Sequence, residues 1–149
     1  MKNNLFNSTL EMELRVLLLL SSNQKALFSI DRLISLDFIT CYAEQFQLPY
    51  ENLHGDNDYM YSELVTRRMM IQEAVKSLVR QGLIDVKVNQ GYLYSVSESG
   101  SEYINSLNSE YSSQYRVIAR EAIKVFKKYS DLELDVVIND NAARSIRRR

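Results

Sequence analysis

The stretch that decides the fold is Ser62–Val96, which reads SELVTRRMMIQEAVKSLVRQGLIDVKVNQGYLYSV. Its first half places four apolar residues on one helical face, at Leu64, Ile71, Val75 and Leu78. Gly82 comes next, and glycine commonly ends a helix because it adopts the left-handed conformation without strain. The first half therefore predicts a helix that stops at Gly82.

The second half predicts a β-hairpin. Apolar and charged residues alternate over 84–88, a turn sequence follows at 89–91, and a second short run rich in tyrosine and valine covers 92–96. A helix that feeds a short hairpin is typical of the second half of a winged helix-turn-helix. We therefore expect a mainly α fold with a small β-hairpin, in which the wing covers about 83–96. Modules of this kind bind DNA or other proteins.

The length and composition indicate a soluble, mostly helical chain that forms a single domain. It has 149 residues, 46% hydrophobic and 25% charged, with one proline and four glycines. So few turn-forming residues argue against an all-β fold. The single cysteine, Cys41, excludes an internal disulfide, and the apolar run Leu17–Leu20 is too short to cross a bilayer. We expect a cytoplasmic protein.

The sequence lacks the usual marks of an enzyme. Its four scattered glycines do not form a phosphate-binding loop, and one histidine, His54, with one cysteine cannot build a zinc site alone. No pair of residues suited to acid–base or nucleophilic catalysis stands out. We therefore expect no catalytic residues, no metal and no cofactor.

A second apolar stripe follows the hairpin. Apolar residues recur at steps of three or four from Ile104 to Tyr129, close to the helical repeat of about 3.6. This predicts one long C-terminal helix over about 101–129, unless Asn108-Ser109 divides it. So long a stripe exceeds what a small body can cover, so we expect a protein partner on it, at Tyr111, Tyr115, Ile118, Ala122 and Val125.

These patterns divide the chain into three parts. A winged-helix domain is expected over 1–98, a long helical segment over 99–130, and a basic-ended tail without helical pattern over 131–149. Four of the 18 basic residues lie in 141–149, which leaves 14 basic against 19 acidic residues in the rest. A body of that sign is a poor overall match for a phosphate backbone.

Direct contact with nucleic acid nevertheless has candidate residues. The helix before Gly82 and the chain end both carry basic side chains, and the candidates are Arg67, Arg68, Lys76, Arg80, Arg144, Arg147, Arg148 and Arg149. The start of that helix carries Glu63, which would repel phosphate. A solvated surface is the alternative for all of them.

Four charged residues lie in otherwise apolar helical segments. They are Arg15 in the first segment and Asp31, Arg32 and Asp37 in the second. Buried charges have to be paired or hydrogen-bonded. We therefore expect a structural ion pair between the first two helices, either Arg15–Asp37 or Arg15–Asp31.

Three short motifs, in order, resemble the middle components of three-component ABC ATPase systems, including the Lamassu type. The motifs are Leu5-Phe6-Asn7-Ser8-x-Leu10-Glu11-x-x-Leu14-Arg15, Ile30-Asp31-Arg32-Leu33-x-x-Leu36-Asp37-Phe38 and Tyr61-Ser62-Glu63-Leu64-x-x-Arg67-Arg68-x-x-Ile71. After the third motif come Gly82-Leu83-Ile84 and the hairpin, in the order that the family has. The resemblance covers about residues 5–126. It implies that Arg15, Asp31, Asp37 and Arg67 form a polar framework that fixes the helices.

The resemblance also implies a function. Such a middle component is a non-enzymatic subunit that binds an SMC- or Rad50-like ATPase and helps couple it to an effector, often a nuclease, in defence against phage or plasmids. DNA contact would then come through the complex. The alternative from the residues themselves is a free-standing winged-helix transcription regulator that binds DNA as a dimer.

Overall fold

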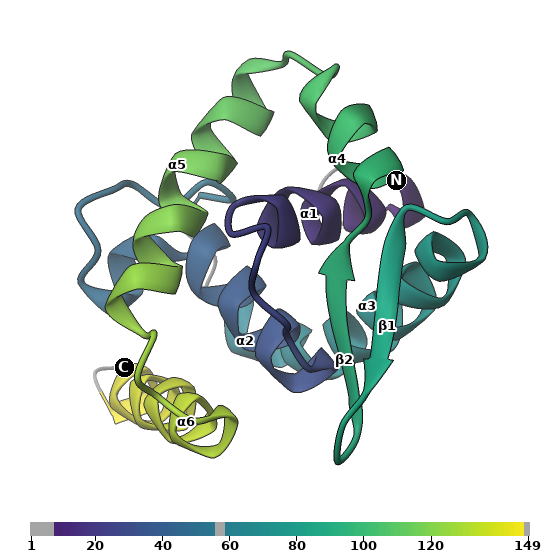
Figure 1. Ribbon diagram of the computed structural model, residues 1–149. Helices are drawn as coiled ribbons and strands as arrows, with labels where there is room; N and C mark the ends of the chain where they lie inside the picture. The colour runs from purple at the N-terminus through teal and green to yellow at the C-terminus, as the bar shows by residue number, and fades with distance from the viewer. Residues whose placement is uncertain (1–7, 56–58, 148–149) are drawn as a thin grey trace.

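Helices make up most of the chain, and a single two-stranded antiparallel hairpin accompanies them in the part that the computed structural model describes, residues 8–55 and 59–147 (Figure 1). In chain order the elements are α1 (Thr9–Ser21), α2 (Ile30–Cys41), η2 (Ala43–Phe46), η3 (Met60–Ser62), α3 (Glu63–Arg80), β1 (Ile84–Val88), β2 (Tyr92–Val96), α4 (Glu98–Asn105), α5 (Glu110–Val125) and α6 (Asp131–Arg147). The mainly helical fold with a small hairpin is confirmed. Within those ranges, no helix combines the length and apolar character needed to span a lipid bilayer.

Local sequence signals place the ends of the first helices. The Ser8 hydroxyl accepts a hydrogen bond from the Glu11 backbone N–H at 3.1 Å, which satisfies one of the free donors at the start of α1. Ser29 does the same for Arg32 at the start of α2. Helix α3 ends as predicted, because Gly82 takes a positive φ of 75° and the Leu83 N–H turns back to the Leu78 carbonyl.

The hairpin packs against α1, α2 and α3, and a backbone bridge ties it to the segment before α2. Its register pairs Val86 with Tyr94 and Val88 with Tyr92, across a turn in which Gln90 and Gly91 both have positive φ. Tyr94 also exchanges two backbone hydrogen bonds, of 2.8 and 2.9 Å, with Phe28 in the segment between α1 and α2. This bridge ties β2 to the chain that precedes α2.

The long helix expected over 101–129 is divided into two. Ser109 breaks it by accepting a hydrogen bond from the Ser112 N–H, which caps a new helix, and α5 leaves α4 at a wide angle (Figure 1). The periodic stripe runs through the break because both helices turn their apolar faces inward. Helix α4 begins after Ser97, whose hydroxyl accepts from Gly100 N.

The segment expected to be a tail is also helical. In α6, Ser130 and Glu133 form a capping box, with each side chain accepting from the other residue's backbone N–H. Only two of its side chains, Leu134 and Ile138, are buried, and α6 packs on α2. Two buried positions in 17 residues leave a weak pattern in the sequence.

Helix α1 is the centre of the core. Its residues 17–20 are four consecutive leucines, all fully buried, so this helix is covered on every side. Figure 1 shows α1 between α5, α4 and the hairpin, with α3 behind the hairpin, and α1 contacts α2, α3, α4 and α5. Gly100 lets α4 approach closely, because a Cβ there would lie 1.9 Å from the Leu83 carbonyl oxygen. The helices after residue 98 therefore complete the same core as those before it.

Candidate functional site

The most concentrated chemistry in the chain is a buried carboxylate, Asp37 on α2. It is 2% exposed and accepts hydrogen bonds from side chains of three other helices. Arg15 of α1 binds it with two nitrogens, Nε to Oδ1 at 2.9 Å and Nη2 to Oδ2 at 3.0 Å. Arg67 of α3 donates from Nη1 to Oδ2, and Tyr115 of α5 donates its hydroxyl to Oδ1 at 2.6 Å.

Further carboxylates balance the two guanidinium groups. Glu63 Oε1 lies 3.1 Å from Arg67 Nη2 and accepts from the Tyr42 hydroxyl at 3.2 Å. Glu11 Oε2 lies 3.5 Å from Arg15 Nη1. Each guanidinium thus contacts one fully buried and one partly buried carboxylate. We call Arg15, Asp37, Arg67 and Tyr115 the Asp37 cluster.

Electrostatics keep this cluster ionised. Burial alone would raise the pKa of Asp37, but the positive charges of Arg15 and Arg67 outweigh it and hold that pKa well below its usual range. Burial raises the pKa of the Tyr115 hydroxyl, and the Asp37 charge raises it further, so Tyr115 stays a hydrogen-bond donor. Burial likewise raises the pKa of the neighbouring Cys41 thiol to about 12. The cluster is therefore a fixed ion pair that joins four helices.

Of the four polar residues expected to form a framework, three lie together in the structure and one does not. Arg15, Asp37 and Arg67 lie together, but Asp31 lies on the outer side of α2 and pairs with Arg68 at 2.8 Å, where both side chains are about half exposed. Of the two ion pairs considered, the structure contains Arg15–Asp37. Asp31 and Asp37 are six residues apart, about one and two-thirds helical turns, so they lie on different sides of α2, and Asp37 is on the side that meets α1.

The candidate nucleic-acid contacts are scattered. Arg67 is buried in the Asp37 cluster because it shares a face of α3 with Ile71 and Ala74, so it cannot reach a phosphate. Arg68 is paired with Asp31, and Lys76 lies 3.6 Å from Glu73. Arg80 is exposed at the end of α3, and Arg144 and Arg147 are exposed on α6. Arg148 and Arg149 lie outside the described residues.

The expected partner surface on the C-terminal stripe is mostly core. Tyr115, Ile118 and Ala122 are buried because α5 turns this face onto α1 and α2. A partner cannot contact these three side chains in the folded chain. Tyr111 is half-buried, with its hydroxyl 2.9 Å from His54 Nε2. Val125 alone among the five is well exposed, at 45%.

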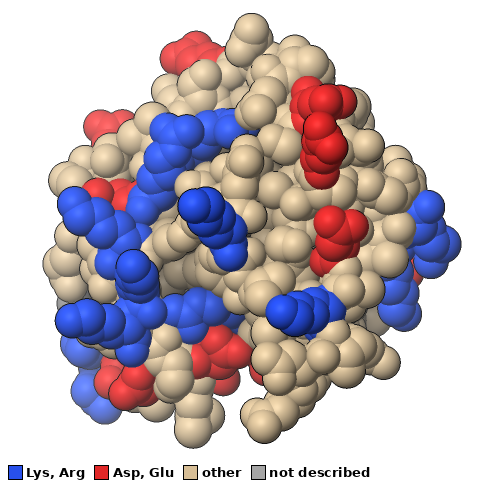
Figure 2. All heavy atoms as spheres, in the orientation of Figure 1, with Lys and Arg blue, Asp and Glu red and all other residues tan. Residues whose placement is uncertain are grey.

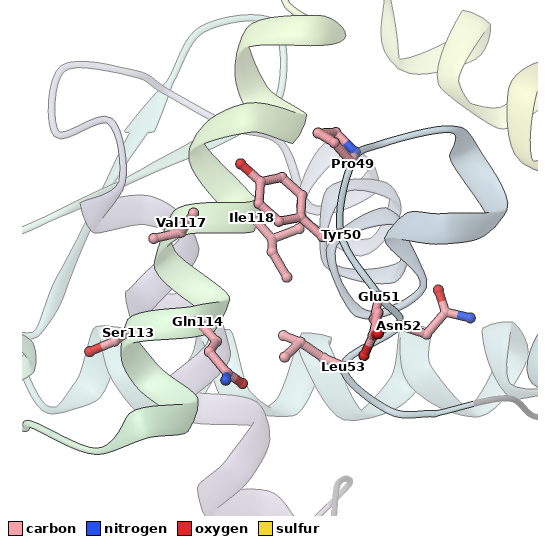
Figure 3. A pocket seen from close by; sticks show the side chains of 9 residues that line it. All are labelled: Pro49, Tyr50, Glu51, Asn52, Leu53, Ser113, Gln114, Val117 and Ile118. Carbon is pink, nitrogen blue, oxygen red and sulfur yellow. The ribbon is translucent and has the colours of Figure 1, made fainter.

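A hollow of about 590 Å³ lies between α5 and the loop that follows η2. Its walls come from residues 49–53 on one side and from Ser113, Gln114, Val117 and Ile118 on the other. Figure 3 shows Leu53 and Gln114 pointing toward each other across it. Asn52 is held by the backbone, because its Oδ1 accepts from the Glu44 N–H at 2.9 Å. Glu51 is the one charged residue of this lining, so the hollow offers no acid–base pair.

The rest of the described chain offers little else to a reaction. No group of three or more histidine, cysteine, aspartate or glutamate side chains comes together there in a way that would hold a metal ion. His54, beside Tyr111, is the single histidine. Sequence reasoning missed the His54–Tyr111 contact and the link from Tyr115 to Asp37. A tyrosine within an apolar stripe was the available signal, because a buried hydroxyl needs a partner.

The His54 imidazole makes stability sensitive to acid. Burial, reinforced by the positive charge of Arg15, lowers the pKa of His54 from 6.5 to about 3. Between these values the unfolded chain binds a proton that the folded chain refuses, so stability falls as pH falls from 6.5. We expect His54→Gln to lose less stability than the wild type between pH 6.5 and about pH 4.5, above the range of ordinary carboxylates. Urea unfolding at several pH values measures this, and equal pH slopes for the two proteins would contradict it.

Fold and site together define a small, mainly helical protein in which a buried cluster of charged residues joins the helices. Residues 5–148 match the family described as ABC-three component (ABC-3C) system Middle Component 2. This match spans nearly the whole chain, and the protein belongs to that family. No curated protein and no solved structure matches the chain significantly.

Proposed function

We propose that this protein is a non-catalytic accessory subunit that binds an SMC- or Rad50-like ATPase and couples it to an effector, often a nuclease, in defence against phage and plasmids. Membership of the middle-component family of ABC three-component systems supports an accessory role beside an ATPase. One observation supports a particular contact surface: the outer part of one hairpin face, at Val86, Val88 and Tyr92, is apolar and exposed.

This hairpin face follows from strand geometry. Side chains alternate along a strand, so Val86 and Val88 of β1 share one face with their cross-strand partners Tyr94 and Tyr92. The alternating sequence is typical of a strand with one buried face, yet Val86 is 44%, Tyr92 64% and Val88 71% exposed. Exposed apolar side chains that adjoin one another on a rigid hairpin favour a protein contact.

The same face continues into a groove against α3. The groove has a volume of about 330 Å³, and Val75, Val79 and the stems of Lys76 and Arg80 line it opposite the hairpin. Lys and Arg stems cover apolar surface while their charged ends stay in water. We call the groove and Val86, Val88 and Tyr92 the hairpin face, and we place the contact with the ATPase there.

A winged-helix architecture is part of this proposal. Helices α2 and α3 followed by the β1–β2 hairpin have the required order, with Gly82 at the turn between helix and wing. The Phe28–Tyr94 bridge supports it, because it gives the hairpin a third, very short strand from the segment between α1 and α2. The wing in this interpretation is the β1–β2 hairpin, which carries Val86, Val88 and Tyr92 of the hairpin face.

The absence of catalysis is likewise proposed. Its support is that the most reactive described groups are already engaged or protonated: the Cys41 thiol has a pKa of about 12, and Asp37 accepts from three side chains. A protein-binding role would use the surface of such a chain, while its buried polar groups stabilise the fold.

The test is co-purification with an SMC- or Rad50-like ATPase of an ABC three-component system. We expect a stable complex by size-exclusion chromatography, and at least tenfold weaker binding after Val86→Glu with Tyr92→Glu, since buried apolar anchors dominate interface energies. Val117→Glu with Val125→Glu, on exposed positions of α5, is the matched control and should bind like the wild type.

Three outcomes decide against parts of this proposal. A chain that elutes alone beside the ATPase overturns the accessory role. A dimer that then shifts a promoter fragment at physiological salt supports the alternative of a transcription regulator. A control pair that dissociates while the hairpin pair still binds moves the contact to α5 and back to Val125.

A further inference from the structure

Basic side chains gather on one face of α5. Arg116, Arg120 and Lys124 follow each other at four-residue steps, so they share a side of the helix, and Lys127 and Lys128 continue the row in the turn after it. In Figure 2 basic side chains crowd the left half of the molecule, where Figure 1 places α5 and, below it, α6, and some acidic side chains lie among the lower ones. The net charge of the chain hides this separation.

A hollow of about 360 Å³ extends the basic face toward α2. Lys25 and Arg32 line it from one side, and Lys127, Tyr129 and Ile123 from the other, which brings Lys25 next to the end of α5. Tyr129 is 40% exposed at this hollow. We call Lys25, Arg116, Arg120, Lys124, Lys127 and Lys128 the α5 basic face.

In the described part of the chain several cations lack a carboxylate partner, among them Arg80, Lys87, Arg144 and Arg147, and the α5 basic face gathers the largest group of them. Within residues 8–55 and 59–147, none of the six forms an ion pair with a carboxylate, whereas Arg15, Arg32, Arg67, Arg68 and Lys76 all do. Neighbouring positive charges oppose one another, and Arg116 shows it: burial and the Arg120 charge lower its pKa. The chain thus concentrates uncompensated positive charge where a bound anion would relieve it.

A purely structural explanation covers only part of this face. Cations near a helix C-terminus are favoured by the helix dipole, and this accounts for Lys124, Lys127 and Lys128. The effect falls off within the last turn, so it does not reach Arg116 and Arg120. A row that begins in the middle of the helix calls for an external partner.

We propose that the α5 basic face binds the phosphodiester backbone of a nucleic acid. Within α5, the row from Arg116 to Lys124 is about 12 Å long at 1.5 Å per residue, which is the axial length of about three to four nucleotides of one B-DNA strand. Lys127 and Lys128 continue it in the turn after the helix. Regular spacing along a straight helix matches a repeating line of phosphates better than it matches the irregular charges of a protein surface. The exposed Tyr129 ring lies beside Lys127, where a base of a single strand can stack.

Fluorescence anisotropy of the full chain with a labelled DNA duplex, and with one of its strands alone, tests this across a salt series. The variant Arg120→Gln/Lys124→Gln/Lys128→Gln changes three exposed residues of the face. We expect it to bind at least tenfold more weakly and to reduce the slope of log K against log salt by about 2.7 for the duplex, at about 0.9 per phosphate contact. Tighter binding of the single strand would assign the Tyr129 hollow to unpaired bases.

The matched control makes the same change in charge elsewhere. Lys76→Gln/Arg80→Gln/Lys87→Gln lies on α3 and the hairpin and should bind DNA within about twofold of the wild type, and both variants should melt like it. No binding by the wild type, or equal losses in the two variants, would overturn the proposal. So would tighter binding to polyglutamate than to either DNA, which would make the face a site for acidic proteins.

Discussion

Replacing Asp37 with asparagine is expected to lower the free energy of unfolding by about 3–5 kcal/mol, a large share of the stability of a domain this size. Asparagine has the same shape, so the packing of α2 is kept. It removes the charge, however, and leaves the Arg15 and Arg67 guanidiniums facing each other across a buried site. Chemical unfolding followed by circular dichroism measures the loss.

Asp31→Asn is the control, since it makes the same chemical change six residues earlier in α2. Asp31 meets Arg68 at the surface, where an ion pair contributes at most about 1 kcal/mol. Similar losses in the two variants would mean that Asp37 is not the carboxylate on which the helices depend. A destabilised Asp37→Asn whose stability is regained by adding Arg15→Met would support the electrostatic account.

Tyr115→Ala is expected to cost about 3–5 kcal/mol, because it removes a fully buried aromatic ring from between α5, α1 and α2. Tyr115→Phe separates the two parts of this effect. It keeps the ring but removes the hydroxyl that Asp37 accepts, and we expect a loss of about 1–2 kcal/mol. Thermal and urea unfolding of both variants give the two figures.

Val125→Ala, on the exposed side of the same helix, should change stability by no more than about 0.5 kcal/mol. The comparison also decides what the C-terminal apolar stripe does. A Tyr115→Ala chain that is as stable as the wild type but fails to assemble with the ATPase would place Tyr115 at a partner interface. The burial of its ring in the core predicts unfolding instead.

Much of the fold is readable from local signals in the sequence. Ser8 predicts the start of α1, and Gly82 predicts the end of α3, because helix caps and left-handed turns depend on one or two residues. The hairpin follows from alternation and a turn. The sequence leaves the break at Ser109 open, because Asn108-Ser109 can cap a helix but the apolar repeat passes through it without interruption. Helix α6 was not foreseen, because it buries only Leu134 and Ile138.

The roles of individual side chains were harder to foresee. The sequence alone does not distinguish an arginine that binds phosphate from one that pairs with a buried carboxylate. Arg67, on the helix before the hairpin, pairs with Asp37. Burial distinguishes the two, and burial depends on which helices come together. The same limit applies to Tyr115, Ile118 and Ala122, because a periodic stripe shows that a face is covered but not by what.

The hydrogen bond between Tyr115 and Asp37 joins residues 78 positions apart in the chain. During synthesis, Arg15, Asp37 and Arg67 emerge from the ribosome well before Tyr115 does. The early part of the polypeptide must therefore wait, with its central leucine helix uncovered on the side that α5 will take, until most of the protein has been translated. A chain truncated after the hairpin would leave α1 exposed to solvent on that side. The last three helices are therefore required for stable expression.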